Sequence, residues 1–293
     1  MSRPSMSLLD YDRLVPPGLL RPPPVRVVPG AVSHLQVPFA EYHGWRALRL
    51  DLHLPAAGPG PYPVVVYVHG GSFLTGLPGM GPWRTLPQRG IAVASVGYRF
   101  SGEVKFPGPV EDVRAAVAWT HAQAGVYGLD PDRIALWGSS AGGYLAALAA
   151  VTEQLAPPPR LLAEPSGRPL VRAVVAHYPV TAPDALREDA LEPSNLGELV
   201  AAFFGGTQLP TAVADHLGDA APAPPFLFQH GDADRRVGLG QSRRLHERLL
   251  AAGVSSRLVV VPGGDHGSPE FESPECVDEA ERFLRRSWNE VAP

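Results

Sequence analysis

Residues 134–150, Ile-Ala-Leu-Trp-Gly-Ser-Ser-Ala-Gly-Gly-Tyr-Leu-Ala-Ala-Leu-Ala-Ala, decide the fold of this 293-residue chain. The apolar start predicts a short strand, the small residues in the middle predict a tight turn, and the Ala/Leu-rich end predicts a helix. Residues 138–142 of the turn fit G-x-S-x-G, the pattern of a nucleophile elbow. Only Ser140 has glycines two residues before and after it, so we expect Ser140, rather than Ser139, to be the exposed nucleophile. The alternative is an ordinary glycine-rich turn, but the flanking strand and helix favour the elbow.

The composition is that of a globular protein with ample material for a core. Hydrophobic residues make up 45% of the chain, and 25 basic and 29 acidic residues give a formal net charge of -4. No long run of one sign occurs, so neither nucleic acid nor an anionic membrane surface is an expected partner. Cys276 is the single cysteine, which excludes an intrachain disulfide and a thiolate metal cluster. We expect Cys276 to pack within a helix.

The pattern of apolar residues predicts no membrane segment. No window holds the roughly 18 uninterrupted apolar residues that a membrane-spanning helix needs. The first 30 residues lack a basic start followed by an apolar run, which a secretory signal would require. The sequence therefore predicts a cytoplasmic protein.

Strands and helices are expected to alternate along most of the chain. Residues 1–30 are rich in proline and predict an extended segment. Residues 31–293 are expected to form one α/β domain, with strands at 35–39, 46–54, 63–68, 91–96, 133–137, 171–178, 225–229 and 257–261, and helices at 109–124, 239–252 and 274–288. The first two strands are expected to form an antiparallel edge pair. The rest predicts a mostly parallel, doubly wound sheet whose functional loops follow the carboxyl ends of the strands.

The segment 181–223 breaks this alternation. It is rich in proline, aspartate and alanine, and its one apolar cluster is residues 201–204. We interpret it as a small cap over the site. The alternative is a long helical crossover that does not contact substrate.

Candidate partners for Ser140 follow later strands. A serine hydroxyl is a weak nucleophile at neutral pH, so it needs a base, a group that orients the base, and donors for the oxyanion that forms. Asp232 and Asp234 come after the strand at 225–229, and His266 comes after the strand at 257–261. His246 also follows the acids, but it lies in the middle of a predicted helix. The order Ser, Asp, His is the order found in α/β hydrolases.

Several further motifs accompany this order. They are His69-Gly70-Gly71, residues 98–107, residues 127–134, the pattern H-G-x-x-D at 230–234, and His266-Gly267. Together with the elbow, they make the chain resemble an α/β hydrolase of the esterase/lipase type, near the hormone-sensitive-lipase-like and feruloyl-esterase-like carboxylesterases. The resemblance covers most of the chain and implies the α/β-hydrolase fold.

The resemblance also implies roles for individual residues. Asp234 occupies the last position of H-G-x-x-D and is the implied triad acid, with Asp232 as its rival. His266 is the implied base. The implied oxyanion donors are the backbone N–H groups of Gly71, Ser72 and Ala141, while His69 and Gly70 are expected to support the loop. Ser72 stands where the family more commonly has a third glycine, a change that keeps the backbone donor.

Other polar and aromatic residues have both a structural and a functional interpretation. Tyr98-Arg99 and Glu111-Asp112 predict a buried or half-buried network that supports the site loops, rather than a substrate contact. Aromatic side chains could line an acyl pocket or belong to the ordinary core; the candidates are Phe73, Trp83, Phe203 and Phe204. His69, His230 and His266 lack the spacing of metal ligands, so no metal site is expected.

The sequence therefore predicts a serine hydrolase that cleaves carboxylic esters through an acyl-enzyme on Ser140. One alternative keeps the triad but acts on a formamide, thioester or lactone, or in a biosynthetic acyl-transfer or cyclisation step. A second alternative is a binding module without catalysis. No cofactor is implied, and the expected partner is a small-molecule ester. The sequence does not decide between a monomer and a homodimer.

Overall fold

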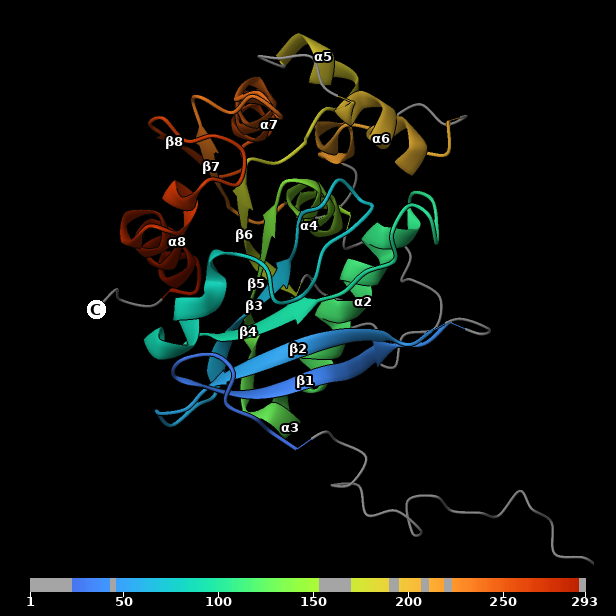
Figure 1. Cartoon of the computed structure of the whole chain (residues 1–293). Helices are drawn as coiled ribbons and strands as arrows, with labels where there is room; N and C mark the ends of the chain where they lie inside the picture. The colour runs from blue at the N-terminus through green and yellow to red at the C-terminus, as the bar shows by residue number, and fades with distance from the viewer. Residues whose placement is uncertain are drawn as a thin grey trace, which may run out of the picture.

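The computed structural model is built on one mixed β-sheet with helices on both faces (Figure 1). The described residues are 23–42, 46–152, 170–189, 195–206, 211–218 and 223–289. The strands are β1 Ala31–Ala40, β2 Leu48–Pro55, β3 Tyr62–Val68, β4 Ala92–Val96, β5 Leu129–Ser139, β6 Val171–His177, β7 Phe226–Gly231 and β8 Ser256–Val261. The α-helices are α2 Gly108–Ala122, α3 Ala124–Tyr127, α4 Ala141–Val151, α5 Leu186–Asp189, α6 Leu196–Phe203, α7 Gly240–Ala251 and α8 Pro274–Ser287. Short 3-10 helices are η3 Pro82–Arg89, η4 Pro183–Ala185, η5 Val213–His216 and η6 Pro269–Glu272.

The eight strands follow the order β1-β2-β4-β3-β5-β6-β7-β8. β1 pairs with β2, and β2 with β4, in antiparallel fashion, whereas the strands from β4 through β8 pair in parallel. The predicted antiparallel pair at one edge and the predicted mostly parallel, doubly wound sheet are therefore confirmed. The parallel arrangement brings the carboxyl ends of β5, β7 and β8 to the same edge of the sheet.

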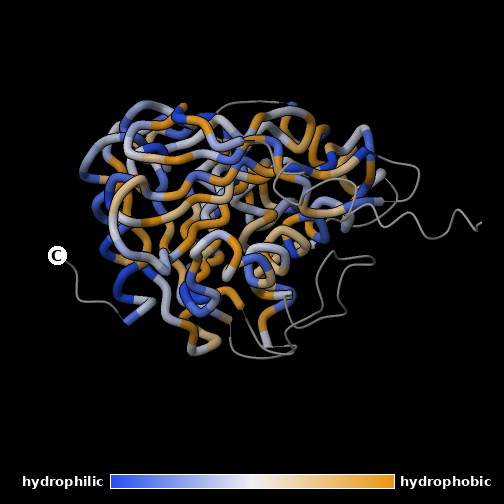
Figure 2. The backbone as a smooth tube through the Cα atoms, turned by 90° about the horizontal axis from the view of Figure 1, so that it is seen from below, coloured by the Kyte–Doolittle hydropathy of each residue, from blue (hydrophilic) through white to orange (hydrophobic). Residues whose placement is uncertain are grey.

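Alternate residues of β3 explain why two helical layers are needed. Val64, Val66 and Val68 belong to the core on the face that α2, α4 and α7 cover. Val65 and Tyr67 point to the other face, where they share a core with η3 and α8. Figure 2 shows the corresponding pattern, with hydrophobic segments crossing the interior. A strand buried on both faces reads as a continuous apolar run, as residues 63–68 do.

The segment 181–223 contains η4, α5, α6 and η5, with residues 190–194, 207–210 and 219–222 outside the described residues. The side chain of Leu199, from α6, lines the same cavity as Ser140. This contact supports a cap, although the cap and the boundaries of the domain stay predictions. Of the proline-rich segment 1–30, residues 1–22 lie outside the described residues.

In the part of the chain that the structure describes, no helix is both long enough and apolar enough to cross a bilayer. The predicted cytoplasmic location stays a prediction.

Candidate active site

Ser140 lies at the sharp turn between β5 and α4. Its backbone has φ 55° and ψ -121°, a conformation that a residue with a side chain rarely adopts. The flanking glycines allow this turn: a Cβ atom on Gly138 would lie 2.2 Å from the carbonyl oxygen of Gly142, and one on Gly142 would lie 2.1 Å from that of Val68. The backbone N–H of Ser140 donates to the carbonyl of His177 across the sheet edge, at 2.9 Å. The crowded turn therefore holds the hydroxyl of Ser140 at the carboxyl end of β5.

Two side chains from later loops complete a hydrogen-bonded chain with Ser140. The Nε2 atom of His266 is 2.8 Å from Oγ of Ser140, and its Nδ1 atom is 2.8 Å from Oδ2 of Asp234. Asp234 follows β7 and His266 follows β8, so the chain of contacts crosses neighbouring strand ends. Because a carboxylate only accepts hydrogen bonds, Nδ1 of His266 carries the proton and Nε2 accepts from the hydroxyl of Ser140. This is the geometry in which a serine can lose its proton to a histidine.

The carboxylate of Asp234 is buried, yet it is held in its ionised form. Burial, the largest single effect, works to raise its pKa, but hydrogen bonds from His230 and His266, the charge of His266 and the backbone N–H of Val237 outweigh it and hold the pKa well below its ordinary value. The backbone N–H groups of Arg236 and Val237 donate to Oδ1 at 2.9 and 2.8 Å. An ionised, fully hydrogen-bonded carboxylate can stabilise an imidazolium beside it.

The rival acid, Asp232, has a different set of contacts. Its Oδ1 atom accepts from the backbone N–H of Gly263 at 2.7 Å, and its side chain is exposed. This contact ties the loop after β7 to the loop after β8. Asp265, next to His266, accepts from the guanidinium of Arg235, which lowers the pKa of that carboxyl to about 2. Both acids brace the loops that carry Asp234 and His266.

The loop after β3 passes directly over the elbow. A Cβ atom on Gly70 would lie 2.9 Å from the carbonyl oxygen of Ser139, so a side chain there would push the loop outward. Within the described part of the chain, the backbone N–H groups of Gly71, Ser72 and Ala141 donate no hydrogen bond. These donors are therefore free to bind an oxyanion beside Ser140.

His69, at the start of this loop, contacts the loop backbone and the ring of Tyr98. The buried ring of His69 stacks on Tyr98 with 4.6 Å between centroids, and its Nδ1 atom donates to the carbonyl of Gly70 at 2.8 Å. Burial lowers the pKa of His69, which favours the neutral ring. The hydroxyl of Tyr98 donates to the carbonyl of His69 at 3.1 Å, and Arg99 forms a buried ion pair with Asp112 at 2.6 Å. These contacts form a buried network, and its predicted role in supporting the site loops stays a prediction.

A cavity of about 520 Å³ opens above Ser140. Its walls combine apolar side chains from three segments with polar groups around the triad; among them are Leu74, Met80, Leu199, Tyr178, Arg236 and Glu272. The four aromatic residues that the sequence offered for an acyl pocket are absent from its lining. They are buried behind the wall, where Phe73 and Phe203 stack at 4.1 Å and Trp83 donates to the carbonyl of Met80 at 2.8 Å; Phe204 packs beside Phe203. Their burial therefore favours a role in the core over direct contact with substrate.

The sequence assigns no role to three residues of the site: Tyr178 and Arg236 lie outside the motifs, and His230 begins the H-G-x-x-D pattern. Tyr178 follows β6 with φ 36° and packs its ring edge-on against His266, at 4.7 Å between centroids. His230 contacts the carboxylate of Asp234, and Arg236 faces the cavity. The positions of His230 and Arg236 beside the triad acid are readable from the sequence, but the directions of their side chains are not.

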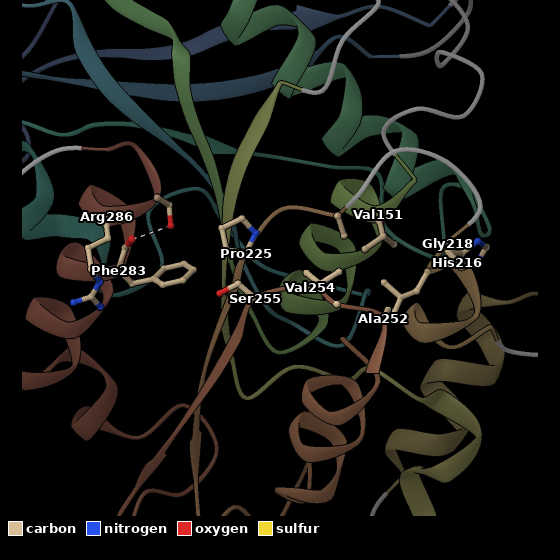
Figure 3. Close-up of a pocket in the computed structure, with 13 residues that line it drawn as sticks. Val151, His216, Gly218, Pro225, Ala252, Val254, Ser255, Phe283 and Arg286 are labelled. Carbon is tan, nitrogen blue, oxygen red and sulfur yellow. Dashed lines mark hydrogen bonds between the residues drawn. The ribbon is translucent and has the colours of Figure 1, made fainter. Parts of the chain in front are cut away.

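A second cavity, of about 590 Å³, lies at the opposite edge of the sheet (Figure 3). Pro225 and Ser255 border it just before β7 and β8 begin, with Phe283 and Arg286 from α8 on one side and Val151 and His216 on the other. His216 contacts the hydroxyl of Thr211 at 3.0 Å. Among the described residues that line this cavity, none is acidic.

The described residues contain no group of three or more His, Cys, Asp or Glu side chains placed to hold a metal ion. Cys276 is a free, buried cysteine in α8, and its carbonyl accepts from the side chain of Gln229 at 2.9 Å.

Known proteins are similar to this chain in sequence and in fold. The carboxylesterase NlhH of Mycobacterium tuberculosis is 31% identical over 247 residues, which cover 78% of this chain and 74% of NlhH. A truncated carbohydrate esterase from gut microbiota superposes with a TM-score of 0.75 and 25% identity, covering 92% of this chain and 100% of the other. Esterase B from Lactobacillus rhamnosis superposes with a TM-score of 0.74 and 25% identity, covering 89% and 86%.

The fold, the site and these relatives define an α/β hydrolase of the esterase type. More narrowly, the chain belongs to the BD-FAE family, whose pattern matches residues 50–249. The predicted resemblance and the predicted enzyme class, a hydrolase of carboxylic esters, are thereby confirmed.

Proposed function

We propose that the protein cleaves carboxylic esters through an acyl-enzyme on Ser140, with His266 as general base and Asp234 as the acid that orients it. The supporting observation is the continuous chain from Asp234 through His266 to Ser140, with two contacts of 2.8 Å. Both distances are within the range over which protons are transferred between positioned groups.

The first half of the reaction would form the acyl-enzyme. Oγ of Ser140 attacks the ester carbonyl while Nε2 of His266 takes its proton, and the N–H groups of Gly71, Ser72 and Ala141 bind the oxyanion. The ionised Asp234 stabilises the imidazolium that forms. The tetrahedral intermediate then collapses, and His266 gives its proton to the leaving alcohol.

The second half would release the acid. Water enters above His266, which takes a proton from it as the water oxygen attacks the acyl carbonyl. Collapse of the second tetrahedral intermediate returns the proton to Oγ of Ser140 and frees the carboxylic acid. A cavity of about 520 Å³ has room for a small-molecule ester.

A fluorophosphonate probe tests the nucleophile directly. The probe would be added to the wild type, Ser140→Ala and Ser139→Ala, and the mass of each intact protein would be measured by mass spectrometry. Initial rates on p-nitrophenyl acetate, butyrate and octanoate would be measured in parallel. Ser139 is a matched control because it adjoins the nucleophile but accepts a hydrogen bond from Tyr67. We expect one adduct in the wild type and in Ser139→Ala, and none in Ser140→Ala.

Two results would contradict the proposal. A folded wild type with neither adduct nor turnover would favour the binding-module alternative. A strong preference for a thioester, lactone or formanilide over a matched ester would keep the triad but move the function to the other acyl-transfer alternative.

A further inference from the structure

Among the described residues, no carboxylate pairs with the guanidinium of Arg236, which lines the cavity that contains Ser140. Arg236 lies after β7, is half-buried, and donates through Nη2 to Oγ of Ser72 at 2.9 Å. Its neighbour Arg235 pairs with the carboxylate of Asp265, whereas Arg236 makes no ion pair within the described part of the chain. One residue of an Arg-Arg pair thus braces a loop, and the other faces the substrate space.

The carboxylate of Asp234, two residues before Arg236, is engaged elsewhere. Asp234 accepts hydrogen bonds from His266 and from the backbone N–H groups of Arg236 and Val237, and it also contacts His230. Glu272 lines the same cavity, and within the described residues it forms no ion pair with Arg236. A guanidinium has several N–H donors, and only one bond of the Arg236 head group is made within the described residues. The remaining donors can bind an anionic group.

The contact with Ser72 fixes where such a group would lie. The backbone N–H of Ser72 is a proposed oxyanion donor, and its side chain holds Arg236, so the guanidinium lies beside the place of the scissile carbonyl. Apolar side chains on another part of the wall, Leu74, Met80 and Leu199, can contact the hydrocarbon part of a substrate. Arginine binds carboxylates through two parallel hydrogen bonds, which fixes orientation as well as charge.

We propose that Arg236 selects esters that carry a carboxylate a few bonds from the scissile carbonyl, as in half-esters of dicarboxylic acids or acyl esters of hydroxy acids. The inference rests on the proposed function, because it assigns a substrate class to the same site. Arg236 binds the carboxylate and takes no part in the transfer of protons.

Two pairs of substrates of nearly equal shape test the charge preference and show on which side the carboxylate lies. Monoethyl succinate and ethyl levulinate differ by a carboxylate against a methyl ketone on the acyl side. In the second pair, 3-acetoxypropionate carries a carboxylate on the alcohol side of the ester, and 4-acetoxy-2-butanone carries a methyl ketone in its place. Hydrolysis would be followed in a pH-stat at pH 7.5. We expect kcat/KM for the charged member of one pair to exceed that of its neutral partner by about tenfold or more.

Variants then assign this preference to Arg236. Arg236→Gln keeps a polar side chain beside Ser72 but removes the charge, and we expect the charged-to-neutral ratio of kcat/KM to fall by about tenfold, mainly through KM. Arg236→Lys should retain part of the ratio because it keeps the charge without the planar fork. Arg248→Gln removes one charge from the exposed face of α7 and should leave the ratio unchanged.

A second readout separates binding from support of the loop. Succinate should inhibit the wild type competitively against a neutral ester, with an inhibition constant that rises with added NaCl and in Arg236→Gln. An equal loss of rate on charged and neutral esters in Arg236→Gln would show that Arg236 only braces Ser72, and would overturn the inference. Absence of a charge preference in a wild type that hydrolyses neutral esters would also overturn it, whereas loss of all ester turnover would instead contradict the proposed function.

Discussion

His230 and Asp234 meet in the interior, with Nε2 of the histidine 3.3 Å from Oδ2 of the carboxylate. The same Nε2 atom is 2.8 Å from the carbonyl of Val237, and Nδ1 is 2.8 Å from the hydroxyl of Ser242. Because both oxygens near Nε2 are acceptors, this atom carries the proton, and Nδ1 accepts from Ser242. Asp234 therefore contacts two histidines, and of these two His266 is the one that reaches Ser140.

Replacing His230 should weaken catalysis most at low pH. His230→Phe removes a donor that helps to hold the pKa of Asp234 below its ordinary value, so that pKa rises. The proposed mechanism needs Asp234 ionised. We expect kcat to fall by about tenfold, as for the loss of one hydrogen bond to a charged group, and the acid side of the pH–rate profile to move to higher pH.

The pH–rate profile of His246→Phe serves as the control. His246 lies on α7, where it contacts Ser256 and not the triad. An acid limb in His230→Phe that coincides with that of the wild type would show that His230 has no influence on Asp234.

Acid should destabilise the fold through buried histidines. Burial lowers the pKa of His177 from 6.5 to about 3 and that of His53 from 6.5 to about 4. Between the folded and the unfolded pKa the unfolded chain binds more protons, so the free energy of unfolding falls as pH drops below about 6.5. From pH 7 to pH 5, His177 alone should account for about 2 kcal/mol.

Urea denaturation of the wild type and His177→Gln at both pH values measures this effect. The variant should lose less stability than the wild type on going from pH 7 to pH 5, whatever its stability at pH 7. An equal loss in both proteins would rule out His177 as a source of the acid sensitivity.

Loss of the buried ion pair between Arg99 and Asp112 should lower the free energy of unfolding far more than loss of a surface pair. Asp112→Asn leaves the guanidinium of Arg99 buried without its negative partner, and we expect the free energy of unfolding to fall by about 3–5 kcal/mol. Asp278→Asn breaks the partly exposed pair with Arg89 and should cost about 1 kcal/mol or less. Chemical denaturation measures the free energy of unfolding of both variants. Similar losses in the two would show that burial of the Arg99–Asp112 pair does not set the cost.

A methyl group at Gly70 should impair the proposed oxyanion hole while the fold persists. The new Cβ atom would lie 2.9 Å from the carbonyl oxygen of Ser139 and 3.2 Å from Cβ of Ser140, so the loop must move. Since misplaced oxyanion donors cost about 10²–10³ in kcat, we expect Gly70→Ala to lose about a hundredfold.

Gly102→Ala is the matched control, because a Cβ atom there meets nothing within 4 Å. Kinetics with p-nitrophenyl butyrate and thermal unfolding would be measured on both variants. A Gly70→Ala enzyme with wild-type kcat would show that this close approach does not position the donors.

The parallel sheet and the strand-turn-helix at Ser140 were predictable because their signals are local. The apolar run at 63–68 and the glycines around Ser140 report constraints that act within a few residues, namely burial on both faces and a crowded turn. The contact of His266 with Ser140 was predictable only from the order of motifs and the resemblance to a family.

The lining of the cavity could not be predicted in the same way. Phe73 and Phe203 are apolar aromatics that suit a core and a pocket equally, and packing between a loop and a helix that are distant in sequence decides between the two. Arg235 and Arg236 are identical neighbours in sequence, yet one pairs with Asp265 and the other faces the cavity. Such differences depend on side-chain direction at the end of a strand, which no periodic pattern reports.

The 126 positions that separate Ser140 from His266 make hydrolysis a reporter of complete assembly. During synthesis, the serine emerges long before the base that activates it, and the two meet only when β8 has paired with β7. On the proposed mechanism, a chain that has formed only the first strands of its sheet carries an inert hydroxyl. Recovered activity during refolding would therefore time the docking of the last strand, with no need for a spectroscopic label.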